Sequence, residues 1–116
     1  MIEFIFISRH VPTPEQHALA AELGITLRHV GDRDAFAVTI DELNDLGGVG
    51  AIVVHPALAL KCRLSGLLVG VYENANRAPE GAKPEFFARA LHVYWRKGEI
   101  ISAEQLAVAS RDFYDD

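Results

Sequence analysis

Residues 50–72, GAIVVHPALALKCRLSGLLVGVY, decide the fold of this chain. Two runs of aliphatic residues, 50–54 and 67–72, lie at the ends of this stretch, and residues 57–64 between them have helical character. Strands that are apolar along their whole length are typical of a sheet that is covered on both faces. A strand, a helix and a second buried strand therefore predict a right-handed crossover between two parallel strands.

The same alternation extends towards the amino terminus. Apolar and β-branched runs predict strands at 2–8 and 25–30. Helices are predicted over 13–23 and 39–46, because each begins with a capping-box sequence. We therefore expect a single α/β domain over residues 1–116, with a Rossmann-like, three-layer architecture and a mainly parallel sheet.

The segment 84–95 allows two interpretations. It could be a helix, because Phe87, Leu91 and Trp95 would share one helical face. It could also be a strand that pairs with residues 99–101 across a tight basic turn. The strand is the favoured interpretation, and it would give the sheet an antiparallel carboxyl-terminal strand or hairpin.

The composition limits the classes of function. The chain has 116 residues, 50% of them hydrophobic, which suits one domain with a real core. Its formal net charge of −5 disfavours long nucleic acid as a partner, because such binding needs many phosphate contacts from Lys and Arg. Cys62 is the single cysteine, so no internal disulfide can form, and we expect a core thiol.

A membrane partner is not expected either. The most apolar stretch, residues 51–72, contains His55, Lys61 and Arg63, which a membrane span would have to bury. Glu3 also stands where a secretory signal would carry positive charge. These features predict a cytoplasmic protein.

Polar side chains gather where three of the predicted strands end. Because the carboxyl ends of parallel strands meet at one edge of a sheet, these side chains should lie close together. The candidates that follow the three strands are Ser8, Arg9, His10, His55, Asn74 and Arg77. Arginines and histidines beside the amino ends of helices favour a small anion such as a phosphodiester.

Ser8-Arg9-His10 is the sharpest of these clusters. Arg9 could hold phosphate, and His10 could act as an acid or a base near neutral pH. The alternative is a strand that becomes polar only because it reaches solvent. Solvated or capping roles stay open for Thr13, His55, Asn74 and Arg77.

No metal or cofactor is indicated by the sequence. The five histidines have no pair at ligand spacing, and a lone cysteine brings no second thiolate. The first strand is followed neither by Gly-x-Gly-x-x-Gly nor by a Walker loop, so the usual dinucleotide and triphosphate sites are not predicted.

The opening segment has a recognisable order. A strand ending in FISRH at 6–10 is followed by TPEQ at 13–16 and by a helix that ends in LG at 23–24. Buried strands, an apolar helix and an aromatic strand then follow over most of the chain. This order resembles that of small CRISPR-associated proteins of the ring-nuclease type.

The resemblance implies a Rossmann-like homodimer that binds cyclic oligoadenylate, a second messenger of type III CRISPR antiviral defence. The family-type reaction needs no metal: a ribose 2′-hydroxyl attacks the adjacent phosphate and leaves a cyclic phosphate end. Ser8, Arg9 and His10 match the family's first-strand turn, with Ser8 and His10 as catalytic candidates and Arg9 as a ligand-binding one.

The remaining ligand-binding candidates come from the strand topology. They are Thr13, His55, Asn74 and Arg77.

Two alternatives to the enzyme stay open for a defence or mobile-element protein. One is a non-catalytic module that binds the same small anionic nucleotide, and the other is an interaction module in which the aromatic segment 86–95 pairs with a partner or a second copy.

Overall fold

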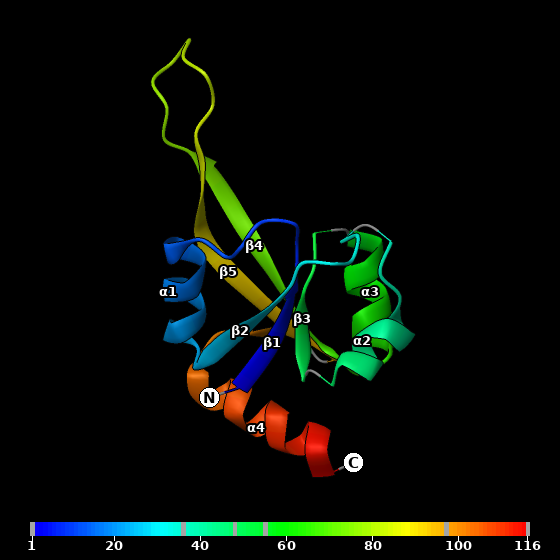
Figure 1. The fold of residues 1–116 in the computed structure, drawn as a ribbon. Helices are drawn as coiled ribbons and strands as arrows, with labels where there is room; N and C mark the ends of the chain where they lie inside the picture. Colours follow the sequence, from blue (N-terminus) through cyan, green and yellow to red (C-terminus); the bar gives the residue numbers. More distant parts are fainter. Residues whose placement is uncertain (1, 36, 48, 55, 97, 116) are drawn as a thin grey trace.

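Hydrogen bonding joins six strands into one mixed sheet with the order β2-β1-β3-β4-β5-β6 (Figure 1). The computed structural model describes residues 2–35, 37–47, 49–54, 56–96 and 98–115. The strands are β1 (Ile2–Ile7), β2 (Ile25–Val30), β3 (Gly50–Ile52), β4 (Leu68–Asn76), β5 (Phe86–Trp95) and β6 (Gly98–Ile100). The helices are α1 (Pro14–Glu22), α2 (Ile40–Leu46), α3 (Pro56–Leu64) and α4 (Ala103–Asp115).

The first four strands are parallel, as the sequence predicts. Phe4 of β1 is aligned with Leu27 of β2 on one side and with Gly50 of β3 on the other. The chain therefore leaves β1 for one neighbour and later returns past β1 to the other. The carboxyl ends of β1 and β3 form the switch point of the sheet, where crossovers diverge and leave a crevice.

Helices cover both faces of the sheet. On one face, Phe4 and Leu68 pack in a buried cluster with Ala20 of α1 and Leu106 of α4. On the other face, a second cluster holds the buried side chains of α2 and α3, including Cys62. Figure 1 shows α1 and α4 apart from α2 and α3, with the sheet between the two pairs. Within the described ranges, no helix combines the length and the apolar character that crossing a membrane requires.

A glycine allows the central strands to pack closely. A Cβ atom added to Gly50 would come within 2.6 Å of Cζ of Phe4, whose side chain is fully buried. The aromatic ring therefore lies over the backbone of β3, in space that any other residue would need.

The carboxyl-terminal strands are antiparallel. β5 pairs with β4 along Phe86–Tyr94 and with β6 along Val93–Trp95, which confirms the strand interpretation of the segment 84–95. The strand predicted from the apolar run 67–72 is too short, because β4 continues to Asn76. Cross-strand pairing to β5 overrides the low strand propensity of this polar segment.

The β4–β5 hairpin projects beyond the rest of the sheet (Figure 1). It contributes to the elongated shape of the molecule, with extents of 51 × 30 × 22 Å. Asn76 organises the base of the hairpin loop, because its Oδ1 accepts hydrogen bonds from the backbone N–H groups of Ala78 and Glu85. The hairpin rises at the same edge of the sheet as the switch point.

Candidate ligand-binding cleft

A cleft of about 780 Å³ lies beyond the carboxyl ends of β1, β3 and β4. This volume is within the range of small-molecule sites. The residues that line it are 6–10, 31–35, 52–54, 71–72 and 74, together with Gln16 of α1. The cleft therefore occupies the switch point, at the edge where the sequence predicts a site.

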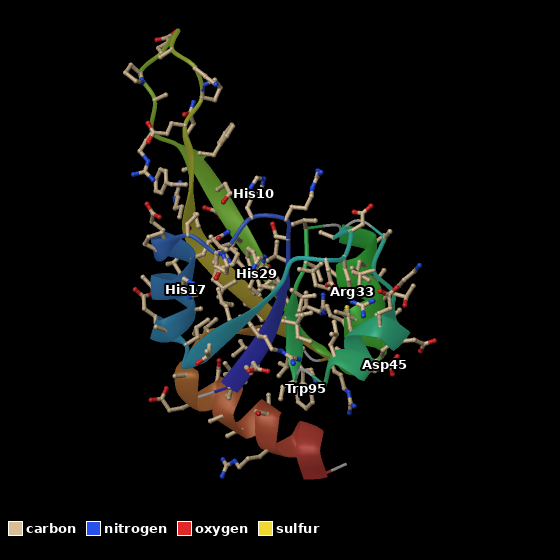
Figure 2. All side chains as sticks on the ribbon, viewed as in Figure 1. His10, His17, His29, Arg33, Asp45 and Trp95 are labelled. Carbon is tan, nitrogen blue, oxygen red and sulfur yellow. The ribbon has the colours of Figure 1, made fainter. Side chains whose placement is uncertain are left out.

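The turn at Ser8, Arg9 and His10 forms one wall of the cleft. The hydroxyl oxygen of Ser8 accepts a hydrogen bond from the backbone N–H of His10 at 3.1 Å. Nε2 of His29 donates to the carbonyl oxygen of Ser8 at 2.6 Å, which ties the turn to the end of β2. Figure 2 shows His10 and His29 at this edge, whereas His17 lies on α1. The side chains of Arg9 and His10 are exposed at the cleft.

The charges in the cleft are mixed. Two arginines, Arg9 and Arg33, line it together with two aspartates, Asp32 and Asp34. Arg33 forms an ion pair with Glu42 at 2.9 Å. The lining therefore suits a ligand with one anionic group and several hydrogen-bond donors better than a compact polyanion.

The amino end of α1 is capped by its own residues. Oγ1 of Thr13 accepts from the N–H of Gln16, and Oε1 of Gln16 accepts from the N–H of Thr13. This reciprocal pair satisfies two backbone N–H groups at the amino end of the helix, which would otherwise be available to an anionic ligand. Thr13, a ligand-binding candidate from the sequence, is thus occupied as a cap and is outside the lining of the cleft.

Arg77 also lies away from the lining. It forms ion pairs with Glu15 at 3.0 Å and Glu85 at 3.7 Å, and its guanidinium group lies 4.4 Å from the ring centre of Phe87. Its hydrogen bond holds the pKa of the Glu15 carboxyl below the ordinary value. Arg77 therefore links the base of the hairpin to α1.

Asn74 lines the cleft, but it lies on β4 and not in a loop. The pairing of β4 with β5 shifts between Glu73 and Asn74, which is a β-bulge. Bulges re-aim side chains and are frequent next to functional sites. Asn74 thus reaches the cleft from a strand whose register changes at that point.

Tyr72 lines the cleft and connects two elements. Its hydroxyl group donates a hydrogen bond to the carbonyl oxygen of Gln16 at 2.7 Å. Burial raises the pKa of this phenol, so it stays neutral and remains a donor. Tyr72 therefore joins β4 to α1.

The structure brings Ser8, Arg9, His10 and Asn74 together. His55 lies outside the described residues. The candidates taken from the sequence did not include the 31–35 segment, which lines the cleft. The signal was present, because Gly31 and Asp32 directly follow a predicted strand that is parallel to β1.

A second hollow, of about 420 Å³, lies between β6 and α4. Trp95, Ile100 and Val108 give it an apolar lining, and Glu99 and Glu104 add acidic groups. Those carboxylates disfavour an anionic ligand. The cleft at the switch point is therefore the better candidate site for a ligand with an anionic group.

The described residues of the cleft offer groups for binding and for proton transfer. In the part of the chain that the structure describes, no group of three or more His, Cys, Asp or Glu side chains could hold a metal ion. The candidate groups for proton transfer are the imidazole of His10 and the hydroxyl of Ser8.

The chain was compared with known proteins in three ways. No protein-family model, no curated protein and no solved structure matches it.

Proposed function

We propose that the cleft binds a nucleotide and that the protein is a Rossmann-like ring nuclease, which cleaves cyclic oligoadenylate without a metal. One observation carries the proposal: Ser8, Arg9 and His10 lie together in a cleft at the switch point of a parallel sheet. Ligands of α/β proteins bind at such points. The identity of the nucleotide is supported by the order of strand, turn and helix in residues 6–24, which resembles that of ring nucleases.

Each residue of the turn has a part in the proposed reaction. The ribose 2′-oxygen attacks the phosphorus and the bond from phosphorus to the 5′-oxygen breaks, which leaves a 2′,3′-cyclic phosphate and a 5′-hydroxyl. His10 would carry the proton from the attacking hydroxyl to the departing oxygen. Arg9 would stabilise the charge on the phosphate oxygens. Ser8 accepts the N–H of His10, which leaves its hydroxyl proton to donate to the phosphate.

The charge balance of the cleft supports a homodimer as the active form. A cyclic oligoadenylate carries one phosphate for every nucleotide, whereas the arginines of one cleft are Arg9 and the already paired Arg33. Two clefts related by a two-fold axis would divide the phosphates of one ring between them.

Incubation with cyclic tetra-adenylate in the presence of EDTA, followed by chromatography, tests the proposal. The wild type should yield linear products with cyclic phosphate ends. His10→Ala should slow cleavage by about 10²-fold to 10⁴-fold, because it removes the proton carrier. His17→Ala is the matched control, because His17 is exposed on α1 outside the cleft. If the protein at micromolar concentration neither cleaves nor binds cyclic tetra-adenylate, the proposal is contradicted.

A non-catalytic nucleotide-binding module is the second candidate. It is favoured by the contact between Ser8 and His10, which runs from a backbone N–H to the hydroxyl and is typical of a structural turn. This candidate predicts saturable binding of cyclic tetra-adenylate with no product, and the same affinity for the wild type and His10→Gln.

A dimeric interaction module is favoured by the β4–β5 hairpin. β6 covers only Val93–Trp95 of β5, so among the described strands residues 86–92 keep one open edge, and Phe86 is 69% exposed. Open, apolar strand edges associate with other chains. Sedimentation at increasing concentration should then show dimers that Phe86→Lys abolishes. Leu64→Lys, at an exposed apolar position on α3, should keep them.

A further inference from the structure

Asp32 is a carboxylate in a cleft that also holds an arginine. It follows β2, the strand that pairs with β1, and it lines the cleft together with Arg9. Arg33, the next residue, is engaged by Glu42 at 2.9 Å. Among the ion pairs of the described residues, none involves Asp32. Its exposed carboxylate is therefore available to a ligand.

Asp32 and Arg9 require different groups from one ligand. A guanidinium group only donates hydrogen bonds and attracts phosphate, whereas a carboxylate only accepts them and repels phosphate. A ligand that satisfies both must carry an anion and a neutral hydrogen-bond donor. A nucleotide carries both, in its phosphate and in its ribose hydroxyl groups.

The position of Asp32 in the fold agrees with a ligand whose phosphate lies at Arg9 and whose neutral hydrogen-bond donor lies at Asp32. In dinucleotide-binding α/β folds, phosphate lies at the turn after the first strand, and an acidic residue further along the chain accepts a hydrogen bond from a ribose hydroxyl. In this chain the turn is 8–10 and the acidic residue is Asp32. We infer that Asp32 recognises the ribose 2′-hydroxyl, so that the cleft selects ribonucleotides over 2′-deoxynucleotides. The inference rests on the proposed nucleotide site and gives that site its substrate class.

Titration of the ¹⁵N-labelled full chain with adenosine 5′-monophosphate and, separately, with 2′-deoxyadenosine 5′-monophosphate tests the inference. Both probes should shift the amide signals of residues 8–10 and 31–35. The deoxy form should bind about tenfold more weakly, because it lacks the hydroxyl group that donates to the charged carboxylate. Asp32→Asn should reduce this difference to about twofold or less. Asp45→Asn, on the exposed side of α2 and outside the cleft, should keep the wild-type ratio.

The outcomes distinguish a failure of the role of Asp32 from a failure of the proposed nucleotide site. Equal affinity of the wild type for the two probes, with shifts at the cleft, would overturn the role of Asp32 and leave the nucleotide site standing. A tenfold preference that survives Asp32→Asn would also overturn it. Absence of shifts at the cleft with either probe would contradict the nucleotide site itself, and the inference with it.

Discussion

Nε2 of His29 donates a hydrogen bond to the carbonyl oxygen of Ser8 at 2.6 Å. The bond joins the carboxyl end of β2 to the loop after β1; Asp32 follows β2, and Arg9 lies in that loop. The backbone N–H of Ser8 also donates to the carbonyl oxygen of Val30 at 3.2 Å. The geometry of the cleft therefore depends on how these two strand ends are held together.

Replacement of His29 by alanine should loosen the Ser8 turn without unfolding the protein. The free energy of unfolding should fall by about 1 kcal/mol or less, because the carbonyl group it leaves is near solvent. Hydrogen exchange of the backbone amides at 8–10 should become faster than in the wild type, while exchange in β4 stays the same. Unchanged exchange at 8–10 would show that the His29 contact does not hold the turn.

His92 lies between two carboxylates on neighbouring strands. Nδ1 is 3.0 Å from Glu99 of β6 and Nε2 is 3.3 Å from Glu73 of β4, while Arg89 of β5 pairs with Glu73 at 3.3 Å. Hydrogen bonds to Glu99 and then to Glu73 raise the pKa of His92 above its ordinary value. The imidazolium form thus joins three strands.

This cluster predicts a pH dependence of stability. A pKa that is raised by folding stabilises the protein fully below the ordinary histidine value of about 6.5, and this contribution is lost as the pH rises through the folded-state pKa. Urea denaturation should be measured from below about pH 6.5 upwards. The free energy of unfolding of the wild type should fall as the pH rises, and that of His92→Gln should fall less. Identical pH profiles for the two proteins would exclude a contribution from the cluster.

Gly50 and Gly70 allow a matched test of the close packing in the sheet. Gly50→Ala should lower the free energy of unfolding by about 1–3 kcal/mol, because its Cβ would meet three ring atoms of the buried Phe4. At Gly70 the nearest atom is Cδ1 of Ile52, the end of a side chain that can rotate, so Gly70→Ala should cost less. Urea denaturation measures the free energy of unfolding of both variants. If Gly70→Ala loses as much as Gly50→Ala or more, the packing explanation is refuted.

Cys62 should be unreactive in the native protein. It is fully buried in α3, and burial raises the pKa of its thiol to about 11. Because the thiolate is the nucleophile, labelling by a thiol reagent at pH 8 should be at least about a hundredfold slower than in urea. Rapid native labelling would contradict the core position that both the sequence and the structure assign to this residue.

Long apolar runs and capping boxes are what made most of the fold predictable. The strand over 25–30 and the helix over 40–46 begin and end in the structure at or within one residue of the expected positions. Buried strands and capped helix ends leave local signals in the sequence. The polar end of β4 leaves no such signal, because these residues form a strand only through their pairing with β5.

The candidate site was only partly predictable, because topology decides which loops meet. The carboxyl-edge rule singled out Ser8, Arg9 and His10, and the structure places them at one cleft. The candidates left out the loop after β2, although that loop directly follows the strand predicted at 25–30. Arg77 was expected near the cleft, but its contacts with Glu15 and Phe87 come from the hairpin's path over α1.

Chemical-shift mapping with cyclic tetra-adenylate tests the central claim most directly. The account predicts that amide shifts of the ¹⁵N-labelled wild type gather at residues 8–10, 31–35 and 72–74, and that Arg9→Ala weakens binding about tenfold or more by removing a charged contact to phosphate. Arg111→Ala, an exposed position on α4, should bind like the wild type. Shifts that gather at the hollow between β6 and α4, or no shifts at all, would contradict it.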